Sequence, residues 1–147
     1  ISHCKFQNIG ILGGGDAVDF SGSNIKVEYS DFTLISDKAI SAGEKSKVEV
    51  SHVNIQDSSI GIASKDGSST TVVDSSIINS NYAAMMAYVK KIEYGGASIN
   101  ALNTHIGKLG AVKSDMFSSI LIDGIRVKQS KINTKQLYKT IMKSSRK

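Results

Sequence analysis

The stretch GDAVDFSGSN at residues 15–24 is nearly repeated twice further along the chain. Its copies read DKAISAGEKSK at residues 37–47 and GIASKDGSST at residues 61–70. A repeat of 20–50 residues is typical of a solenoid, in which each copy forms one layer of the fold. The copies share a small residue followed by an apolar one, at intervals of 22, 22 and 23 residues: Ala17-Val18, Ala39-Ile40, Gly61-Ile62 and Ala84-Met85.

The repeat is built from strands. Residues 1–80 alternate apolar and polar side chains with a period of two, are rich in Val, Ile, Ser and Thr, and lie in a chain that contains no proline. This pattern indicates three short strands per copy, separated by turns that contain glycine. Residues 1–125 are therefore predicted to form a right-handed parallel β-helix of about five coils, an all-β solenoid.

In such a coil, equivalent residues lie about 4.8 Å apart and stack on one another. The spacing predicts two buried aliphatic ladders, because a polar residue in either would leave an unpaired group in the core. The first consists of Val18, Ile40 and Ile62, and the second of Ile25, Val48 and Val72.

Residues 126–147 form a second, basic segment. The last 25 residues contain eight basic side chains and one acidic one, whereas residues 1–122 contain ten basic and twelve acidic side chains. Asn133 or Thr134 can cap a short helix that carries Leu137, Tyr138 and Ile141 on one side. This helix is expected to cap the last coil or to pack along its side, because a solenoid needs its open end covered.

Composition argues against several classes of protein. The body is slightly acidic, which argues against a nucleic-acid-binding face, and no apolar run is long enough to span a membrane. Cys4 is the only cysteine, so no internal disulfide or multi-cysteine metal site can form. The chain begins without Met or a signal peptide, so we expect it to be the C-terminal part of a longer protein. Its uncapped first coil is then expected to contact an upstream domain or a second copy of the chain.

Five stretches also carry a family resemblance. The chain as a whole resembles the pectin-lyase-like superfamily of right-handed β-helix proteins. More narrowly, it resembles the C-terminal β-helix region of bacterial surface proteins similar to the spore-coat CotH-kinase. The stretches that carry the narrower resemblance are GDAVDFSGSN, DKAISAGEKS, GIASKDGS, VKKIEYGGA and INTKQLYKTIMK.

The resemblance implies a location outside the cell or on its surface and a polysaccharide partner. Enzymes of this superfamily use acidic residues from adjacent coils as acid and base or as Ca²⁺ ligands, so Ca²⁺ is the one cofactor that the resemblance suggests. The outward column beside Val18 does not match them, because it contains a carboxylate in one coil only. That column reads Asp19, Ser41, Ala63 and Met86.

The turns that follow the repeat offer better candidates. Glu44 and Asp66 are 22 residues apart and should stack, which would raise the pKa of each carboxyl if they were buried. With Lys65 they form a candidate acid/base site for a sugar substrate. The same residue types also make ordinary exposed turns. The candidate ligand-binding residues beside this site are Tyr88, Lys90, Lys91 and Tyr94.

Two other groups are interpreted as surface features. Asp16 and Lys38 occupy equivalent positions in successive coils, which predicts an exposed ion pair. His3, His52 and His105 are expected to be surface histidines, since two coils separate the first two by roughly 10 Å, too far to share a metal ion. No metal site is predicted.

The favoured function is a polysaccharide-binding module of an extracytoplasmic protein that is not catalytic by itself. One alternative is a polysaccharide lyase or glycoside hydrolase that acts on an acidic polysaccharide through Glu44, Asp66 and Lys65. Another is a structural spacer or oligomerisation stalk.

Overall fold

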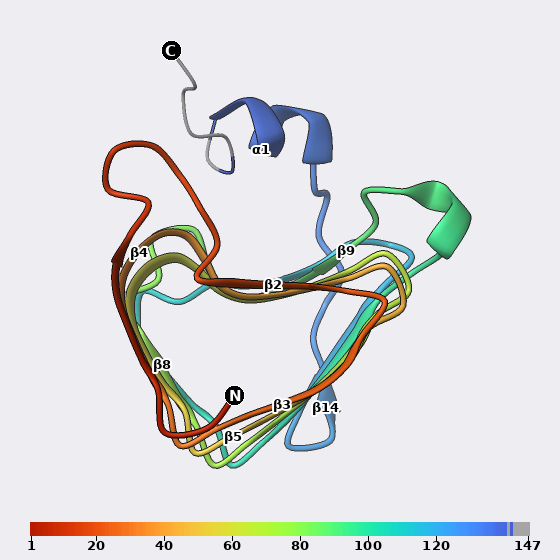
Figure 1. Ribbon diagram of the computed structural model, residues 1–147. Coiled ribbons are helices and arrows are strands. Elements are labelled where there is room, and N and C mark those ends of the chain that lie inside the picture. Colours follow the sequence, from red (N-terminus) through yellow and green to blue (C-terminus); the bar gives the residue numbers. More distant parts are fainter. Residues whose placement is uncertain (141, 143–147) are drawn as a thin grey trace.

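A computed structural model of the chain, which describes residues 1–140 and Met142, is a parallel β-solenoid of about five turns. Viewed along its axis, the coil has a triangular outline with three faces (Figure 1). The parallel β-solenoid predicted from the sequence is therefore confirmed. Nearly all strand pairs in the described part of the chain are parallel, and the one antiparallel pair there, β13 (Ser119–Ile122) with β14 (Ile125–Arg126), lies at the last turn.

The first face carries the strands that open each rung. It contains β1 (Lys5–Ile9), the first parts of β4 (Asp31–Gly43) and β6 (Asn54–Lys65), β8 (Ser76–Ile78) and β11 (His105–Ile106). The second face contains β2 (Val18–Ser21), the second parts of β4 and β6, β9 (Ala83–Tyr88) and β12 (Val112–Ser114). The strands β4 and β6 bend from one face to the next, and the register between them shifts after Ile35.

The third face closes each rung. It contains β3 (Asn24–Glu28), β5 (Lys47–Ser51), β7 (Ser69–Val73), β10 (Ser98–Leu102), β13 (Ser119–Ile122) and β14 (Ile125–Arg126). A short 3-10 helix, η1 (Ile92–Tyr94), projects from the loop between the second and third faces of the fourth rung.

The first predicted ladder is confirmed. Val18 pairs with Ile40, Ile40 with Ile62, and Ile62 with Met85, so the row continues into the fourth rung. Ile40, Ile62 and Met85 are completely buried, whereas Val18 is half-buried in the first rung.

The second predicted ladder is correct at Ile25 and Val48 but wrong at Val72. Val48 pairs with Thr70, and Val72 instead stacks on Val50. Moving two residues along a strand keeps a side chain on the same face, so both Thr70 and Val72 point inward and hydrophobicity alone cannot choose between them. The Thr70 hydroxyl is buried, and no hydrogen-bond partner for it lies among the described residues.

Replacing this hydroxyl with a methyl group is expected to stabilise the protein. Thr70→Val should raise the free energy of unfolding by about 1 kcal/mol, since an unpaired buried polar group is costly. Urea unfolding followed by circular dichroism measures this change. Thr71→Val, on the exposed side of the same strand, is the control and should change stability by less than about 0.5 kcal/mol. An equal rise in the free energy of unfolding of both variants would contradict the conclusion that the Thr70 hydroxyl is buried and unpaired.

Each corner of the triangle contains residues with positive φ. Such residues turn the chain sharply, and most here are not glycine. At the corner before the first face, His3 and His52 stack on opposite sides of the Tyr29 ring, with centroid separations of 5.2 and 4.7 Å. The residues at this corner are His3, Tyr29, His52, Asp74, Asn103 and Asp123. Those at the next corner are Asn8, Leu34, Asp57 and Asn79, and those at the third include Glu44, Lys45 and Asp66.

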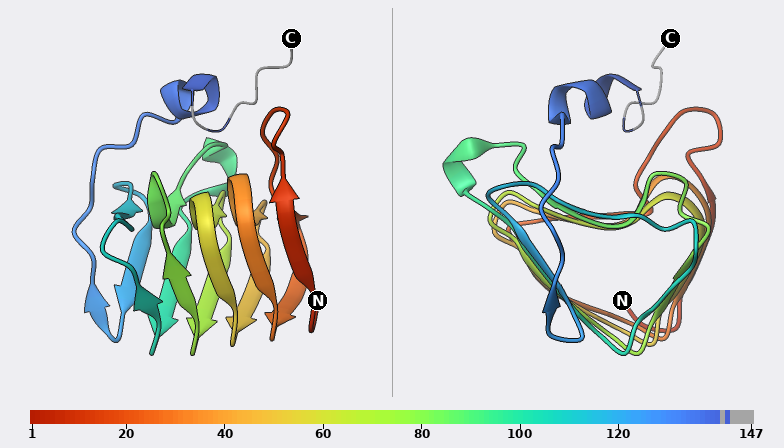
Figure 2. Two further views of the ribbon diagram at one scale, coloured as in Figure 1. Left: turned by 90° about the vertical axis from the view of Figure 1, so that its left-hand side faces the viewer. Right: turned by 180° about the vertical axis from the view of Figure 1, so that it is seen from behind.

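The C-terminal segment packs along the side of the coil. Asn133 caps the helix α1 (Thr134–Thr140) by accepting a hydrogen bond from the Gln136 amide at 3.1 Å. Figure 2 shows α1 above the second face, where Leu137 and Met142 contact the apolar outer surface of the third and fourth rungs. Ile141 lies outside the described residues. No helix in the described part of the chain is long and apolar enough to cross a membrane.

Candidate functional site

The two predicted acidic residues do stack in successive turns. Glu44 follows β4 and Asp66 follows β6, both with a φ of 55°, and the Lys45 amide donates to the Asp66 carbonyl oxygen at 2.9 Å. The repeat therefore places the two backbones correctly. The side chains, however, have separate partners.

The Asp66 carboxylate faces the backbone of the next rung. One of its oxygens accepts hydrogen bonds from the amides of Lys90 and Lys91, at 2.7 and 2.6 Å. Only 1% of Asp66 is exposed. Asp66 thus anchors the loop that follows β9.

Glu44 lies at the surface and is held by two donors. Its carboxylate oxygens bind the Lys91 ammonium and the Ser21 hydroxyl. The hydrogen bond from Lys91, and then that from Ser21, lower the pKa of Glu44. Stacking on Asp66 was predicted to raise this pKa only if the carboxyls were buried, and Glu44 does not meet that condition because it lies at the surface.

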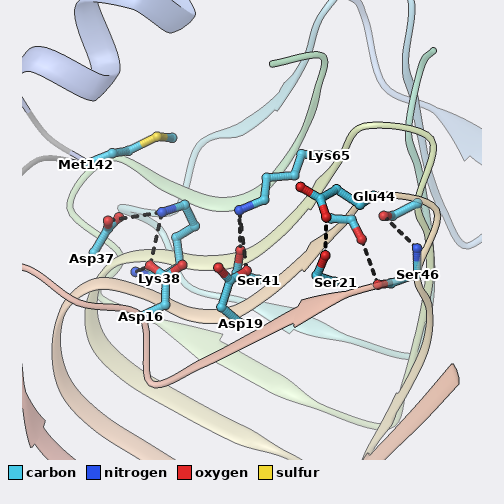
Figure 3. Close-up of polar contacts among 12 residues, drawn as sticks. Asp16, Asp19, Ser21, Asp37, Lys38, Ser41, Glu44, Ser46, Lys65 and Met142 are labelled. Carbon is cyan, nitrogen blue, oxygen red and sulfur yellow. Dashed lines mark hydrogen bonds and ion pairs between the residues drawn. The ribbon is translucent and has the colours of Figure 1, made fainter. Parts of the chain in front are cut away.

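Lys65 extends across the rungs below it instead of facing solvent. Its ammonium group donates to the Ser41 hydroxyl at 2.9 Å and lies 3.4 Å from an Asp19 oxygen (Figure 3). The route crosses Gly43, where a Cβ would come within 2.8 Å of the Lys65 Cε. Glycine therefore leaves room for Lys65 to link three rungs.

The structure brings most of the predicted site residues to one small cavity. Its volume is about 110 Å³, whereas sites for small molecules usually measure about 300–1,000 Å³. The cavity can therefore admit a functional group but not a whole sugar ring. Its lining includes Asp19, Glu44, Lys65, Asp66, Lys90 and Lys91.

Tyr88 is not at the surface, and the prediction that its ring is available for stacking on a sugar is wrong. The side chain is completely buried below α1, where its hydroxyl lies 2.9 Å from the Tyr138 hydroxyl. Burial, and then Tyr138, raise the pKa of Tyr88 well above its usual value. Tyr94 is half-buried, and the Lys91 ammonium lies 5.8 Å from its ring centroid. The Lys90 ammonium lies 4.2 Å from the ring centroid of Tyr138.

The second face also holds a charged cluster, which we call the Lys38 cluster: Lys38, Asp16 and Asp37. The Lys38 ammonium lies 3.0 Å from a carboxylate oxygen of each aspartate (Figure 3). The prediction of an Asp16–Lys38 pair is confirmed, but its expected exposure is wrong, since the Lys38 side chain is 3% exposed. The sequence showed the 22-residue spacing but not that α1 would lie above this part of the face.

Burial shifts the titration of this cluster. It raises the pKa of Asp37 to about 6, against the opposing effect of Lys38. Burial also lowers the pKa of Lys38, but Asp16 and then Asp37 outweigh it, and the net shift is upward. One Asp37 oxygen has no hydrogen-bond partner among the described residues.

Removing the charge of Asp37 is expected to stabilise the protein at neutral pH. A carboxyl with a raised pKa stabilises the fold when it is protonated, and this contribution is lost as the pH rises from about 4 through about 6. Asp37→Asn, which is neutral at every pH, should therefore exceed the parent protein in stability by about 2–3 kcal/mol at pH 7, and by much less at pH 4.

Urea unfolding at several pH values measures this difference. Glu49→Gln, which alters an exposed ion pair with Lys26, is the control and should show no comparable pH dependence. A difference between Asp37→Asn and the parent that stays constant from pH 4 to pH 7 would show that Asp37 titrates normally.

Within residues 1–140 and 142, no three His, Cys, Asp or Glu side chains gather closely enough to hold a metal ion.

Comparison of the chain with protein-family models, with curated proteins and with solved structures gives no match in any of the three. The resemblance to the pectin-lyase-like superfamily and to CotH-kinase-like proteins thus has no support from sequence comparison, whereas the parallel β-solenoid fold is clear.

Proposed function

We propose that this chain is a polysaccharide-binding module of an extracellular or cell-surface protein and is not catalytic by itself. The observation that carries the proposal is a polar groove of about 400 Å³ on the outside of the first face. Hydroxyl groups of a sugar need partners that can donate and accept hydrogen bonds, and this groove offers amide, hydroxyl, carboxylate and ammonium groups. Its polar lining residues are Lys5, Gln7, Asp31, Thr33, Asn54 and Gln56.

The groove is regular because its residues come from successive rungs. Lys5 pairs with Asp31 and Asp31 with Asn54, forming one column, and Gln7, Thr33 and Gln56 form a parallel column. All six side chains are exposed or half-buried. A repeating polymer can meet a hydrogen-bonding group at each rung of such a face, about 4.8 Å apart.

The contacts of Glu44 and Asp66 favour binding over catalysis. A retaining or inverting glycosidase needs one carboxyl that gives up a proton and a second that faces the substrate. Glu44 has a lowered pKa and is paired with Lys91, and Asp66 is buried against two amides. Neither carboxyl is therefore suited to be the proton donor.

A polysaccharide array that includes neutral and acidic polymers tests the proposal. We expect binding to at least one polymer, and a rise of about threefold to tenfold in Kd for Gln56→Ala, which removes one hydrogen-bonding group. Thr71→Ala on the third face is the matched control and should bind like the parent. Lys91→Ala and Tyr94→Ala examine the turn beside Glu44, and a loss confined to these two variants would move the binding site there.

Assays for new reducing ends and for unsaturated products test the enzyme alternative. We expect no turnover of any polymer. Turnover that disappears in Glu44→Gln while binding persists would establish a polysaccharide lyase or glycoside hydrolase instead. If the chain binds no polymer and light scattering shows a defined oligomer, the spacer or oligomerisation stalk replaces the binding module.

A further inference from the structure

A second cavity, larger than the one beside Glu44, lies away from the polar groove and shares only Lys90 with the lining of the Glu44 cavity. It has a volume of about 600 Å³, within the range usual for sites that hold small molecules. Three segments form it: residues 89–92 beside η1, residues 115–117 after β12, and residues 129–132, which lead to α1. Figure 2 shows this last segment rising past the end of the coil toward α1.

One side of the cavity is apolar and unusually exposed. Ile92, Met116 and Phe117 line it, with 70%, 71% and 61% of their surfaces exposed, and Ile132 lies on the opposite segment. Large apolar residues that gather on a concave surface mark a binding site more often than single exposed ones do. Methionine and aromatic side chains also adapt well to flat or branched apolar groups.

The charges around the cavity are predominantly positive. Lys90 and Lys131 line it, and within the described residues neither ammonium group pairs with a carboxylate. The only acidic lining residue is Asp115, and both of its oxygens already accept backbone hydrogen bonds, from Val89 at 2.7 Å and from Phe117 at 3.0 Å. Residues 124–140 contain no acidic side chain and, besides Lys131, four basic ones: Arg126, Lys128, Lys135 and Lys139.

We propose that this cavity binds a small amphipathic organic anion, with an aromatic or branched apolar body against Met116 and Phe117 and its negative group toward Lys90 and Lys131. The Lys90 ammonium lies over the Tyr138 ring, and no carboxylate among the described residues neutralises it or Lys131. An apolar wall beside two such ammonium groups selects an amphipathic anion over a neutral sugar or a cation. The cavity shares no residue with the polar groove, so this proposal does not depend on the polysaccharide proposal.

Titration with 8-anilinonaphthalene-1-sulfonate, a fluorescent aromatic anion, tests the site directly. We expect saturable binding to one site on the folded chain. Phe117→Ala should raise the Kd about tenfold by removing apolar contact, and Lys131→Glu should raise it at least about threefold. Leu109→Ala is the matched control, since Leu109 is 72% exposed but does not line the cavity.

A neutral probe of similar shape, N-phenyl-1-naphthylamine, separates the two parts of the proposal. It should bind about tenfold more weakly than the sulfonate, and equal affinity for both probes would overturn the preference for an anion. Fluorescence that does not saturate, or that falls equally in Phe117→Ala and Leu109→Ala, would overturn the site itself. The substituted side chains of Phe117 and Leu109 are largely exposed, so both variants should fold.

Discussion

Lys38→Met is expected to lower the free energy of unfolding by about 3–5 kcal/mol at pH 7. The substitution keeps the length of the side chain but removes the positive charge that Asp16 and Asp37 share. The buried carboxylate of Asp37 and the half-buried one of Asp16 would then remain without a cation, and breaking a buried ion pair on one side has an effect of this size. Urea unfolding followed by circular dichroism measures the change.

Two further variants show whether burial is the cause. Lys26→Met removes a lysine from an ion pair in which both side chains are mostly exposed, and it should lower stability by less than about 1 kcal/mol. The triple variant Asp16→Asn/Asp37→Asn/Lys38→Met removes all three charges and should recover most of the lost stability. A similar small effect for Lys38→Met and Lys26→Met would mean that the Lys38 cluster is solvated.

Ile40→Asp is expected to prevent folding altogether. Ile40 is completely buried between Val18 and Ile62, within the cluster of apolar side chains that forms the core. A carboxylate there would lose its hydration without gaining a partner, which costs several kcal/mol, while a domain of this size is stable by only about 5–15 kcal/mol. Circular dichroism should show no cooperative thermal transition.

Two controls bracket this result. Ile40→Val removes one methylene and should cost only about 1 kcal/mol. Leu12→Asp introduces the same charge at a fully exposed residue, in the loop between the first and second faces, and should leave the transition almost unchanged. A folded Ile40→Asp protein with a transition near that of the parent would contradict the register of the first ladder.

The sequence predicted the fold well because the repeat acts at the level of single rungs. A period of 22 residues was enough to place Ile40 on Val18 and Glu44 below Asp66, since neighbouring rungs have the same length there. The same period predicted the wrong partner for Val72, which pairs with Val50 and not with Val48. A shift of two residues along the strand leaves a side chain pointing into the core, so the alternation of apolar residues cannot detect it. Periodicity therefore predicts whether a side chain points inward or outward more reliably than it predicts which residue of the next rung it stacks on.

The site was harder to predict because its contacts join residues far apart in the sequence. Tyr88 would face solvent if the chain ended after the coil, but Leu137 and Tyr138, about fifty residues later, cover it. Asp66 accepts its hydrogen bonds from backbone amides, which every sequence possesses, so no residue pattern marks that contact. Repeat analysis can therefore place the turns without identifying their partners.

The position of Lys65 affects how the end of the coil opens. In most repeat folds each unit contacts only its neighbours, so terminal units can fray one at a time. Lys65 starts in the third rung and reaches Ser41 in the second and Asp19 in the first, which ties β2 to β6 directly. Fraying of the first rung must then also break a contact with the third rung, so this end of the solenoid should open less readily than contacts between neighbouring rungs alone would allow.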